Sequence, residues 1–89
     1  MSLDVLNPFD QSLVCSLDYD EGPGLEAKIA AVHEAAERWR EVPLDDRIEQ
    51  VRDGMERFRG ESERIAADVS RQMGKPIVQA RGEVSTVFA

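Results

Sequence analysis

From Leu25 onward, apolar side chains recur at steps of three and four residues, which is the period of an amphipathic helix. The pattern is interrupted at Pro43, at Arg59-Gly60 and at Gly74-Lys75-Pro76. Proline disfavours helix at the residue before it, and glycine is common in the left-handed position that ends a helix. The pattern therefore predicts four helices, near residues 25–40, 44–59, 61–73 and 77–89.

The first twenty residues lack the helical period and instead alternate short apolar clusters with turn-forming residues. Two short apolar clusters, Val5-Leu6 and Leu13-Val14-Cys15, flank Asn7-Pro8 and Asp10, which are typical turn residues. This arrangement predicts two short strands in a hairpin, which is barely stable alone and must pack on something else. The predicted fold class is mainly α, with about four amphipathic helices after a short N-terminal β-hairpin. Residues 1–20 are the hairpin segment, and residues 21–89 are the helical segment of one incomplete domain.

We predict that the apolar faces of the first three helices form the core, because removing apolar side chains from water is favourable. The predicted core residues are Leu25, Ile29, Val32, Trp39, Ile48, Val51, Met55, Phe58, Ile65 and Val69.

The last helix is still apolar and in period where the chain stops at Ala89, so some apolar surface is expected to remain bare. The candidates are Leu13, Leu17, Ile77, Val78, Val84, Val87 and Phe88. A patch of this kind is rare on soluble monomers. We therefore expect a homo-oligomer that associates through exposed apolar helix faces or the hairpin edge.

Composition narrows the class of partner. Eleven basic and eighteen acidic residues give a net charge of −7, which repels phosphate backbones and anionic lipid. Nucleic acid and membrane surfaces are therefore not expected as partners. No apolar run reaches the length of a membrane span, and no signal peptide is visible. The single cysteine cannot form an internal disulfide, and the predicted location is the cytoplasm.

Two short motifs resemble known binding-site patterns but lack residues that those sites need. Gly22-Pro23-Gly24-Leu25-Glu26-Ala27 fits the dinucleotide pattern G-x-G-x-x-G/A, but Pro23 lacks the amide that pyrophosphate needs and acidic residues crowd the approach. His33-Glu34-Ala35-Ala36-Glu37 has glutamate where the zinc motif H-E-x-x-H has its second histidine, and the chain has only one histidine.

Cys15 is the one residue that could be considered as a nucleophile. A reactive thiolate needs a base, a cation or a helix N-terminus beside it. Cys15 instead follows Leu13 and Val14 in an expected strand, with acidic residues nearby that disfavour the thiolate. The sequence therefore predicts that Cys15 acts as a small apolar residue and not as a nucleophile.

The order and spacing of several short motifs are more informative about function than the composition is. Together they resemble the N-terminal segment of an NAD(P)-dependent aldehyde dehydrogenase over nearly the whole chain. The motifs are Asn7-Pro8, Trp39-Arg40 at a helix end, Pro43-Leu44-x-x-Arg47, Met73-Gly74-Lys75-Pro76 and Ala80-Arg81-Gly82-Glu83-Val84. The most specific element is Met-Gly-Lys-Pro with Ala-Arg-Gly-Glu-Val a few residues later.

The resemblance implies a truncated piece of a larger α/β dehydrogenase fold, in which these elements pack on the outside of the cofactor-binding domain. In that family a cysteine thiolate attacks the aldehyde, hydride passes to NAD or NADP, and a glutamate activates the hydrolytic water. None of those residues matches a position here; Cys15 does not match the nucleophile, and Gly22-Pro23-Gly24 does not match the nucleotide loop. The expected catalytic, cofactor-binding and metal residues are therefore none, with no cofactor bound and no activity from this chain alone. The alternative is a free-standing acidic helical interaction module.

Overall fold

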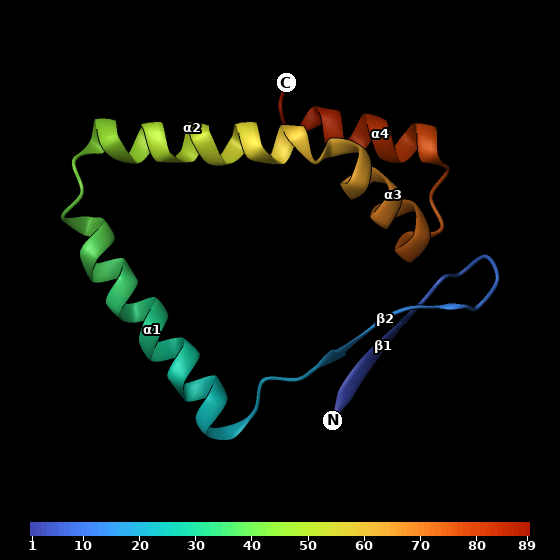
Figure 1. Ribbon diagram of the computed structural model, residues 1–89, viewed down its shortest axis with the longest axis horizontal. Coiled ribbons are helices and arrows are strands. Elements are labelled where there is room, and N and C mark those ends of the chain that lie inside the picture. The colour runs from blue at the N-terminus through green and yellow to red at the C-terminus, as the bar shows by residue number, and fades with distance from the viewer.

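A computed structural model describes all 89 residues, and its elements follow one another around an open ring (Figure 1). The predicted fold class is confirmed, because four helices follow a two-stranded antiparallel hairpin. The elements are β1 (Ser2–Leu6), β2 (Leu13–Asp18), α1 (Gly22–Arg40), α2 (Leu44–Gly60), α3 (Ser62–Met73) and α4 (Ile77–Thr86). No helix is long and apolar enough to cross a membrane.

Local sequence explains most helix boundaries. Helix α1 begins three residues before the expected Leu25, because Pro23 lies in its first turn, where a missing N–H is tolerated. Gly74 ends α3 in the left-handed conformation with φ 72°, and its N–H donates to the carbonyl of Ser70 at 2.9 Å. The Ser70 hydroxyl also donates to the carbonyl of Lys75 at 2.7 Å, which fixes the turn before Pro76 starts α4. Helix α4 ends at Thr86 rather than at residue 89.

The hairpin has one polar and one apolar face. Leu3 pairs with Leu17 and Val5 with Cys15 on the apolar face, and the Ser16 hydroxyl donates to Asp4 on the other. The expected turn residues close the loop. The Asn7 side chain accepts a hydrogen bond from the Phe9 N–H at 2.9 Å, and Asp10 accepts one from the Ser12 N–H at 3.0 Å. The sequence therefore specifies this turn locally, as expected from Asx-turn chemistry.

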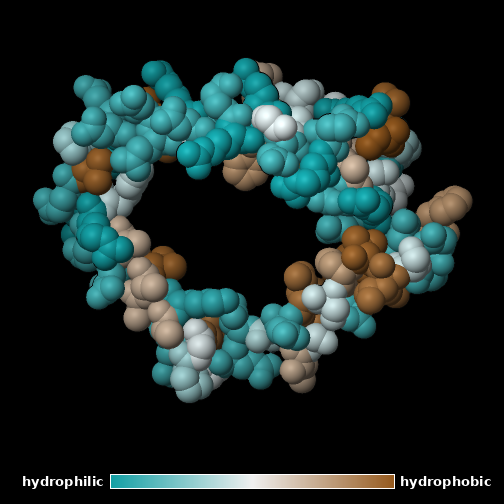
Figure 2. Space-filling model, in the orientation of Figure 1, coloured by the Kyte–Doolittle hydropathy of each residue, from teal (hydrophilic) through white to brown (hydrophobic).

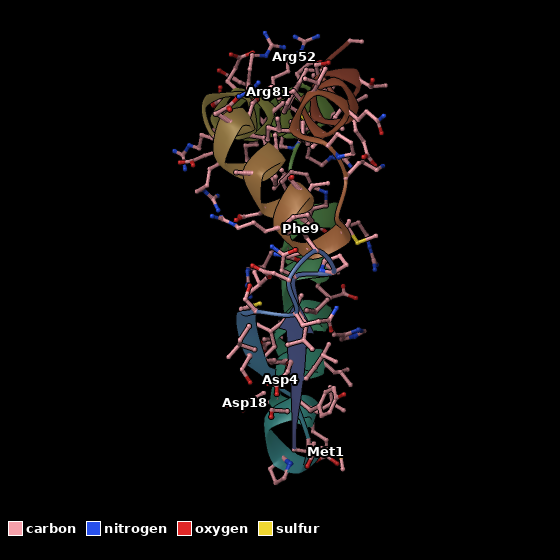
Figure 3. The ribbon with its side chains drawn as sticks, turned by 90° about the vertical axis from the view of Figure 1, so that its right-hand side faces the viewer. Met1, Asp4, Phe9, Asp18, Arg52 and Arg81 are labelled. Atoms are coloured by element: carbon pink, nitrogen blue, oxygen red, sulfur yellow. The ribbon has the colours of Figure 1, made fainter.

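The molecule is a thin, extended slab rather than a ball. Its radius of gyration is 17.4 Å and its extents are 48 × 39 × 14 Å, whereas a compact domain of this length has a radius of gyration of about 12 Å. Figure 3 shows the slab from its edge, with Phe9 at the hairpin tip near the end of α3 and Met1 at the far end of the hairpin. Helices α3 and α4 pack closely, whereas α1 has almost no contact with the other elements.

The predicted core is wrong in most of its members. Only Ala66, Ala80 and Val84 are buried, between α3 and α4, and Ile65, Val69, Ile77 and Phe88 pack around them partly exposed. The exposed members of the predicted set are Leu25, Ile29, Val32, Trp39, Ile48, Val51 and Phe58. These residues do form stripes on α1 and α2, but no other element of the chain covers the stripes. Figure 2 shows the consequence, because apolar atoms gather in separate open patches instead of one core.

The prediction of uncovered apolar residues is confirmed for some residues and wrong for others. Leu13, Leu17, Val78 and Val87 are exposed, as expected. Ile77 and Phe88 are half-buried, and Val84 is buried because α4 turns this side chain onto Ala66 of α3. Uncovered apolar side chains are therefore found on the hairpin, α1 and α2 as well as on the last helix.

Candidate functional site

Helices α3 and α4 are joined by an ion pair with three hydrogen bonds, between Glu63 and Arg81. The Arg81 guanidinium donates from Nη2 to Glu63 Oε1 at 2.6 Å and from Nε to both carboxylate oxygens at 3.0 and 3.1 Å. The hydrogen bonds from Arg81 lower the pKa of the Glu63 carboxyl, and the same contact raises the pKa of Arg81. A carboxylate held ionised in this way is a poor proton donor and a weak base at neutral pH, so the pair joins two helices rather than performing acid–base chemistry.

An open hollow of about 380 Å³ lies beside this pair. Its lining residues are Arg59, Ser62, Glu63, Arg81, Val84, Ser85 and Phe88. The Arg59 guanidinium lies 5.5 Å from the centre of the Phe88 ring, in the range of a cation–π contact. The Ser62 hydroxyl donates to the carbonyl of Arg59 in the last turn of α2, and the Ser85 hydroxyl donates to the carbonyl of Gly82 within α4. The polar groups of this hollow are therefore engaged within the chain.

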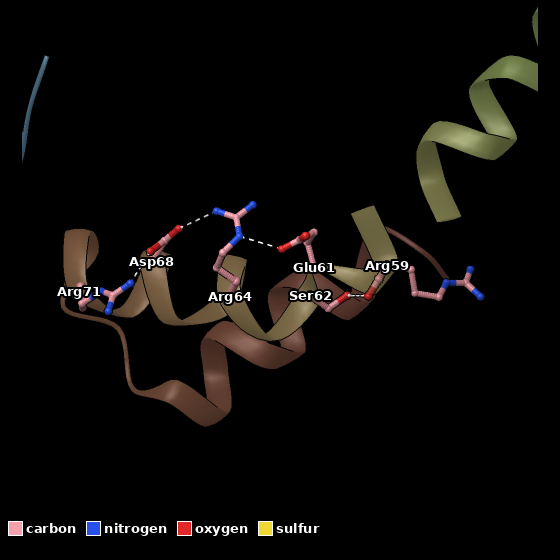
Figure 4. A network of polar contacts seen from close by, with 6 residues as sticks. All are labelled: Arg59, Glu61, Ser62, Arg64, Asp68 and Arg71. Carbon is pink, nitrogen blue, oxygen red and sulfur yellow. Dashed lines mark hydrogen bonds and ion pairs between the residues drawn. The ribbon is translucent and has the colours of Figure 1, made fainter. Parts of the chain in front are cut away.

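The outer face of α3 holds a second set of ion pairs, drawn in Figure 4. Arg64 donates from Nε to Glu61 at 2.8 Å and reaches Asp68 from Nη1 at 3.4 Å, and Arg71 also pairs with Asp68. The hydrogen bond to Glu61 is the main cause of the raised pKa of Arg64. All of these pairs are three or four residues apart on one exposed helix face, so they support the helix and do not form a site.

Cys15 lines a shallow hollow between the hairpin and α3. The other lining residues are Asn7, Ser12, Leu13, Val14, Asp68, Arg71 and Gln72. Cys15 is half-buried on β2, and the one cationic residue that lines the hollow, Arg71, is paired with Asp68. No histidine lies in this hollow to act as a base. The arrangement provides neither activating partner that a nucleophilic thiolate requires.

The motifs that resemble a dinucleotide loop and a zinc site both lie on α1. Gly22, Pro23 and Gly24 form the first turn of the helix, which has no side-chain cap, and Lys28 pairs with Asp20 just before it. His33 lies exposed in the middle of the same helix. The structure contains no group of three or more histidine, cysteine or acidic side chains that could hold a metal ion. The expectation of no cofactor-binding residue in this chain stays a prediction.

The corner between α1 and α2 contains the one buried side-chain nitrogen or oxygen that has no hydrogen-bond partner in the structure. Nε of Arg47 is shielded from solvent and has no hydrogen-bond partner. It belongs to a hollow of about 400 Å³ lined by Trp39, Arg47, Ile48, Val51 and Arg52. In the sequence, Arg47 stands out only as the last residue of the motif Pro43-Leu44-x-x-Arg47. That motif gives no sign that the Arg47 Nε is shielded from solvent and unpartnered.

Four arginines near the end of α1 and on α2 also have no ion-pair partner. None of the ion pairs in the structure includes Arg38, Arg47, Arg52 or Arg57. The remaining arginines and both lysines are all paired with an acidic side chain. Unpaired positive charge in this strongly acidic chain is therefore concentrated at the end of α1 and on α2.

The most specific sequence motif coincides with the packed part of the molecule. Gly74 supplies the left-handed end of α3, Ala80 and Val84 fill the α3–α4 contact, and Arg81 binds Glu63. Lys75 and Glu83 form a further ion pair at 2.6 Å across the start of α4. Met-Gly-Lys-Pro and Ala-Arg-Gly-Glu-Val are thus explained by how the two helices are joined and packed.

Comparison with known proteins gives the family. The aldehyde dehydrogenase family matches residues 1–89. The succinate semialdehyde dehydrogenase [NAD(P)+] Sad of Escherichia coli is 49% identical over 47 residues, which are 53% of this chain and 10% of that protein. The 4-(hydroxymethyl)benzenesulfonate dehydrogenase TsaD1 of Comamonas testosteroni is 32% identical over 76 residues, 85% of this chain and 15% of that protein.

A third relative, the N-succinylglutamate 5-semialdehyde dehydrogenase of Novosphingobium aromaticivorans, is 36% identical over 63 residues, 71% of this chain and 13% of that protein. No solved structure matches the chain significantly. The chain spans only 10–15% of the length of these three curated relatives. The motifs, together with a family match that covers all 89 residues of this chain, show that the chain belongs to the aldehyde dehydrogenase family and corresponds to the N-terminal segment of that family.

Proposed function

We propose that this chain is a structural segment of an enzyme that oxidises an aldehyde to a carboxylic acid with NAD or NADP. The family match over the whole chain carries the proposal. The E. coli relative has NAD(P)+ in its name, which supports the cofactor class. The names of the relatives specify different substrates, so the proposal covers an aldehyde and no single compound.

The structural role follows from what the chain offers chemically. Oxidation in this family proceeds by attack of a thiolate on the aldehyde, and Cys15 has no base or free cation beside it. The well-packed contacts join helices to one another, and the rest of the chain is an open frame with apolar stripes on its surface. Such a frame is suited to covering other protein surface. We place the parent enzyme in the cytoplasm, in keeping with the acidic composition and single cysteine.

A chimera tests this proposal. In the E. coli Sad protein, the matching segment would be replaced by this chain, and NAD(P)+ reduction would be followed with succinate semialdehyde as the probe. We expect the chimera to retain activity, and the 89-residue chain alone to give no turnover above a blank. A chimera that assembles like the parent Sad but is inactive would contradict the structural equivalence. Turnover by the chain alone, with contaminating enzyme excluded by mass, would contradict the scaffold role.

The alternative, a free-standing acidic interaction module, has the same exposed stripes in its favour. The chimera separates the two functions, because an unrelated binding module would not support folding of the dehydrogenase. An inactive, aggregated chimera beside a stable isolated chain would favour the module.

A further inference from the structure

Helices α1 and α2 repeat one sequence pattern at a spacing of 19 residues. Six pairs of positions hold the same residue in both helices: Leu25/Leu44, Ile29/Ile48, Val32/Val51, Glu37/Glu56, Arg38/Arg57 and Arg40/Arg59. Four further pairs keep the charge or the aromatic ring: Glu26/Asp45, Lys28/Arg47, Glu34/Asp53 and Trp39/Phe58. An amphipathic helix requires only that its apolar positions recur. The recurrence of the charged positions therefore needs a further cause.

The structure preserves this equivalence in its ion pairs. Arg40 pairs with Glu37 near the end of α1 at 3.2 Å, and Arg59 pairs with Glu56 near the end of α2 at 3.6 Å. The two pairs occupy the same positions of the repeated pattern. The two helices therefore agree in their local contacts as well as in their sequence.

Both helices also place their charges in the same way around the apolar stripe. At 3.6 residues per turn, the basic residues nearest to the stripe lie within about 80° of its centre; they are Lys28, His33 and Arg40 on α1, and Arg47, Arg52 and Arg59 on α2. The acidic residues lie about 100° or more from the centre; they are Glu26, Glu34, Glu37, Asp45, Asp46, Glu49, Asp53 and Glu56. In a chain with eighteen acidic residues, each stripe is thus bordered by basic residues alone.

No element of the chain covers either stripe. Ile29, Val32 and Val51 are more than half exposed, and α1 has almost no contact with the other elements. At the corner between the two helices (Figure 1), Trp39 of α1 lines the same hollow of about 400 Å³ as Ile48 and Val51 of α2. The two stripes therefore meet at this corner, and one continuous surface can cover both.

We propose that α1 and α2 are two repeats of one docking face, and that each binds an apolar surface bordered by Asp or Glu side chains in the remainder of the same enzyme subunit. This inference rests on the proposed function and names the chemistry of the surface that the chain covers. Two helices with the same apolar stripe and the same basic border fit two equivalent acidic borders, because opposite charges at the edge of a contact select the partner and fix its register.

His33 and Arg52 are the border residues that show the pairing most directly. They occupy equivalent positions of the repeat, and neither forms an ion pair within the chain. Arg38 and Arg57 are likewise equivalent and unpaired. These two lie about 140° from the centre of the stripe, so they stay in solvent when the stripe is covered and provide matched controls.

Zero-length cross-linking in the Sad chimera tests the acidic border. A carbodiimide joins a lysine amine to a carboxylate where the two groups are in contact. Arg52→Lys and His33→Lys each place an amine at the border, and Arg57→Lys and Arg38→Lys place one on the solvent side of the same helices. We expect peptide mass spectrometry to find both border lysines joined to Asp or Glu residues of the Sad part. The two control lysines should give no link to that part.

Charge reversal tests whether the border stabilises the assembled enzyme. Arg52→Glu sets a carboxylate against the acidic border, whereas Arg57→Glu makes the same change of charge on the solvent side. We expect Arg52→Glu to shorten the half-life of the chimera's activity on heating by about threefold or more. Arg57→Glu should leave the half-life close to that of the unmodified chimera. Added salt should reduce the difference, because it screens exposed charges.

The outcomes separate this inference from the proposed function. An active chimera in which the control lysines link to the Sad part as efficiently as the border lysines, or in which no border lysine links, would overturn the inference and leave the function in place. Links from Arg52→Lys without links from His33→Lys would overturn the equivalence of the two helices. An inactive chimera that does not assemble would overturn the function, and the inference with it.

A membrane is the other class of surface that suits basic residues beside an apolar stripe. Sedimentation of the active chimera with vesicles of phosphatidylserine and phosphatidylcholine tests this alternative. Sedimentation that is lost in Arg52→Glu and kept in Arg57→Glu would assign the face to lipid and overturn the protein partner. We expect no sedimentation of the chimera with the vesicles, because the Sad part already covers both stripes.

Discussion

Pro8 at the tip of the hairpin packs against Gly74 at the end of α3, so closely that a Cβ on Gly74 would lie 2.9 Å from Cγ of Pro8. Gly74 also has φ 72°, a conformation that a side chain disfavours. Two of the family motifs, Asn-Pro and Met-Gly-Lys-Pro, are therefore in direct contact, although they are more than sixty residues apart in the sequence. The contact attaches the hairpin to the α3–α4 pair.

Gly74→Ala is expected to destabilise the protein by at least about 1–2 kcal/mol, because the left-handed backbone is strained and the new methyl group meets Pro8. Gly82→Ala is the control. Gly82 lies inside α4 with open space around it, so alanine there should stabilise the helix by about 0.5–1 kcal/mol. Urea unfolding followed by circular dichroism at one protein concentration measures both. Equal effects of the two substitutions would contradict the Pro8–Gly74 contact.

Ala66→Leu should destabilise the α3–α4 pair by about 1–3 kcal/mol through overpacking. Ala66 and Ala80 are both completely buried, and their small size lets the two helices approach closely. Ala35→Leu on the exposed α1 is the matched control and should have almost no effect on thermal unfolding. If Ala66→Leu unfolds at the wild-type temperature, α3 and α4 are not packed as described.

The Glu63–Arg81 pair predicts a pH dependence with a definite sign. Arg81 lowers the pKa of Glu63 in the folded chain, so the stabilisation is complete above the unfolded pKa of about 4.3 and is lost as pH falls through the lower folded pKa. The stability difference between the wild type and Glu63→Gln should therefore be constant near neutrality and disappear in acid.

Thermal unfolding along a pH series measures this difference. Glu26→Gln is the control, since Glu26 forms no ion pair and the substitution should have little effect at any pH. A Glu63→Gln difference that persists unchanged into acid would show that the pair is not ionic. Because both side chains are exposed, added salt should also reduce the difference.

Amide hydrogen exchange should distinguish α1 from α3. Helix α1 has almost no contact with the rest of the chain, and most of the stability of a helix in a protein comes from the packing of its apolar face. We expect its amides to exchange much faster than those of α3, whose inner face packs on α4. Equal protection of the two helices, measured by mass spectrometry of peptides, would mean that another surface covers α1.

The predicted elements agree with the structure where neighbouring residues decide the conformation. The turn that holds Asn7 and Asp10, the left-handed Gly74 and the helix start at Pro76 depend on side chains within a few positions. The apolar stripe predicts the start of α1 three residues late, because the stripe begins at Leu25 whereas Pro23 already allows a first turn.

Burial could not be predicted in the same way. The stripes of α1 and α2 identify which side of each helix is apolar, and the structure leaves Ile29 and Val51 in water although they lie on those stripes. Val84, which was expected to be bare, is buried because α4 folds back on α3. Likewise, the environment of Arg47 depends on how α2 follows α1, and no local pattern around Arg47 reveals that its Nε lacks a partner.

The sequence by itself determined the number and type of the elements, the hairpin turn, most helix ends and the family, because these depend on side chains close together along the chain or on their order. Only the tertiary structure decided that the core is Ala66, Ala80 and Val84, that Pro8 meets Gly74, and that α1 and α2 are left uncovered. The physical reason is that periodicity specifies the direction of an apolar face. What that face meets depends on the path of the whole chain and on the surfaces available to it.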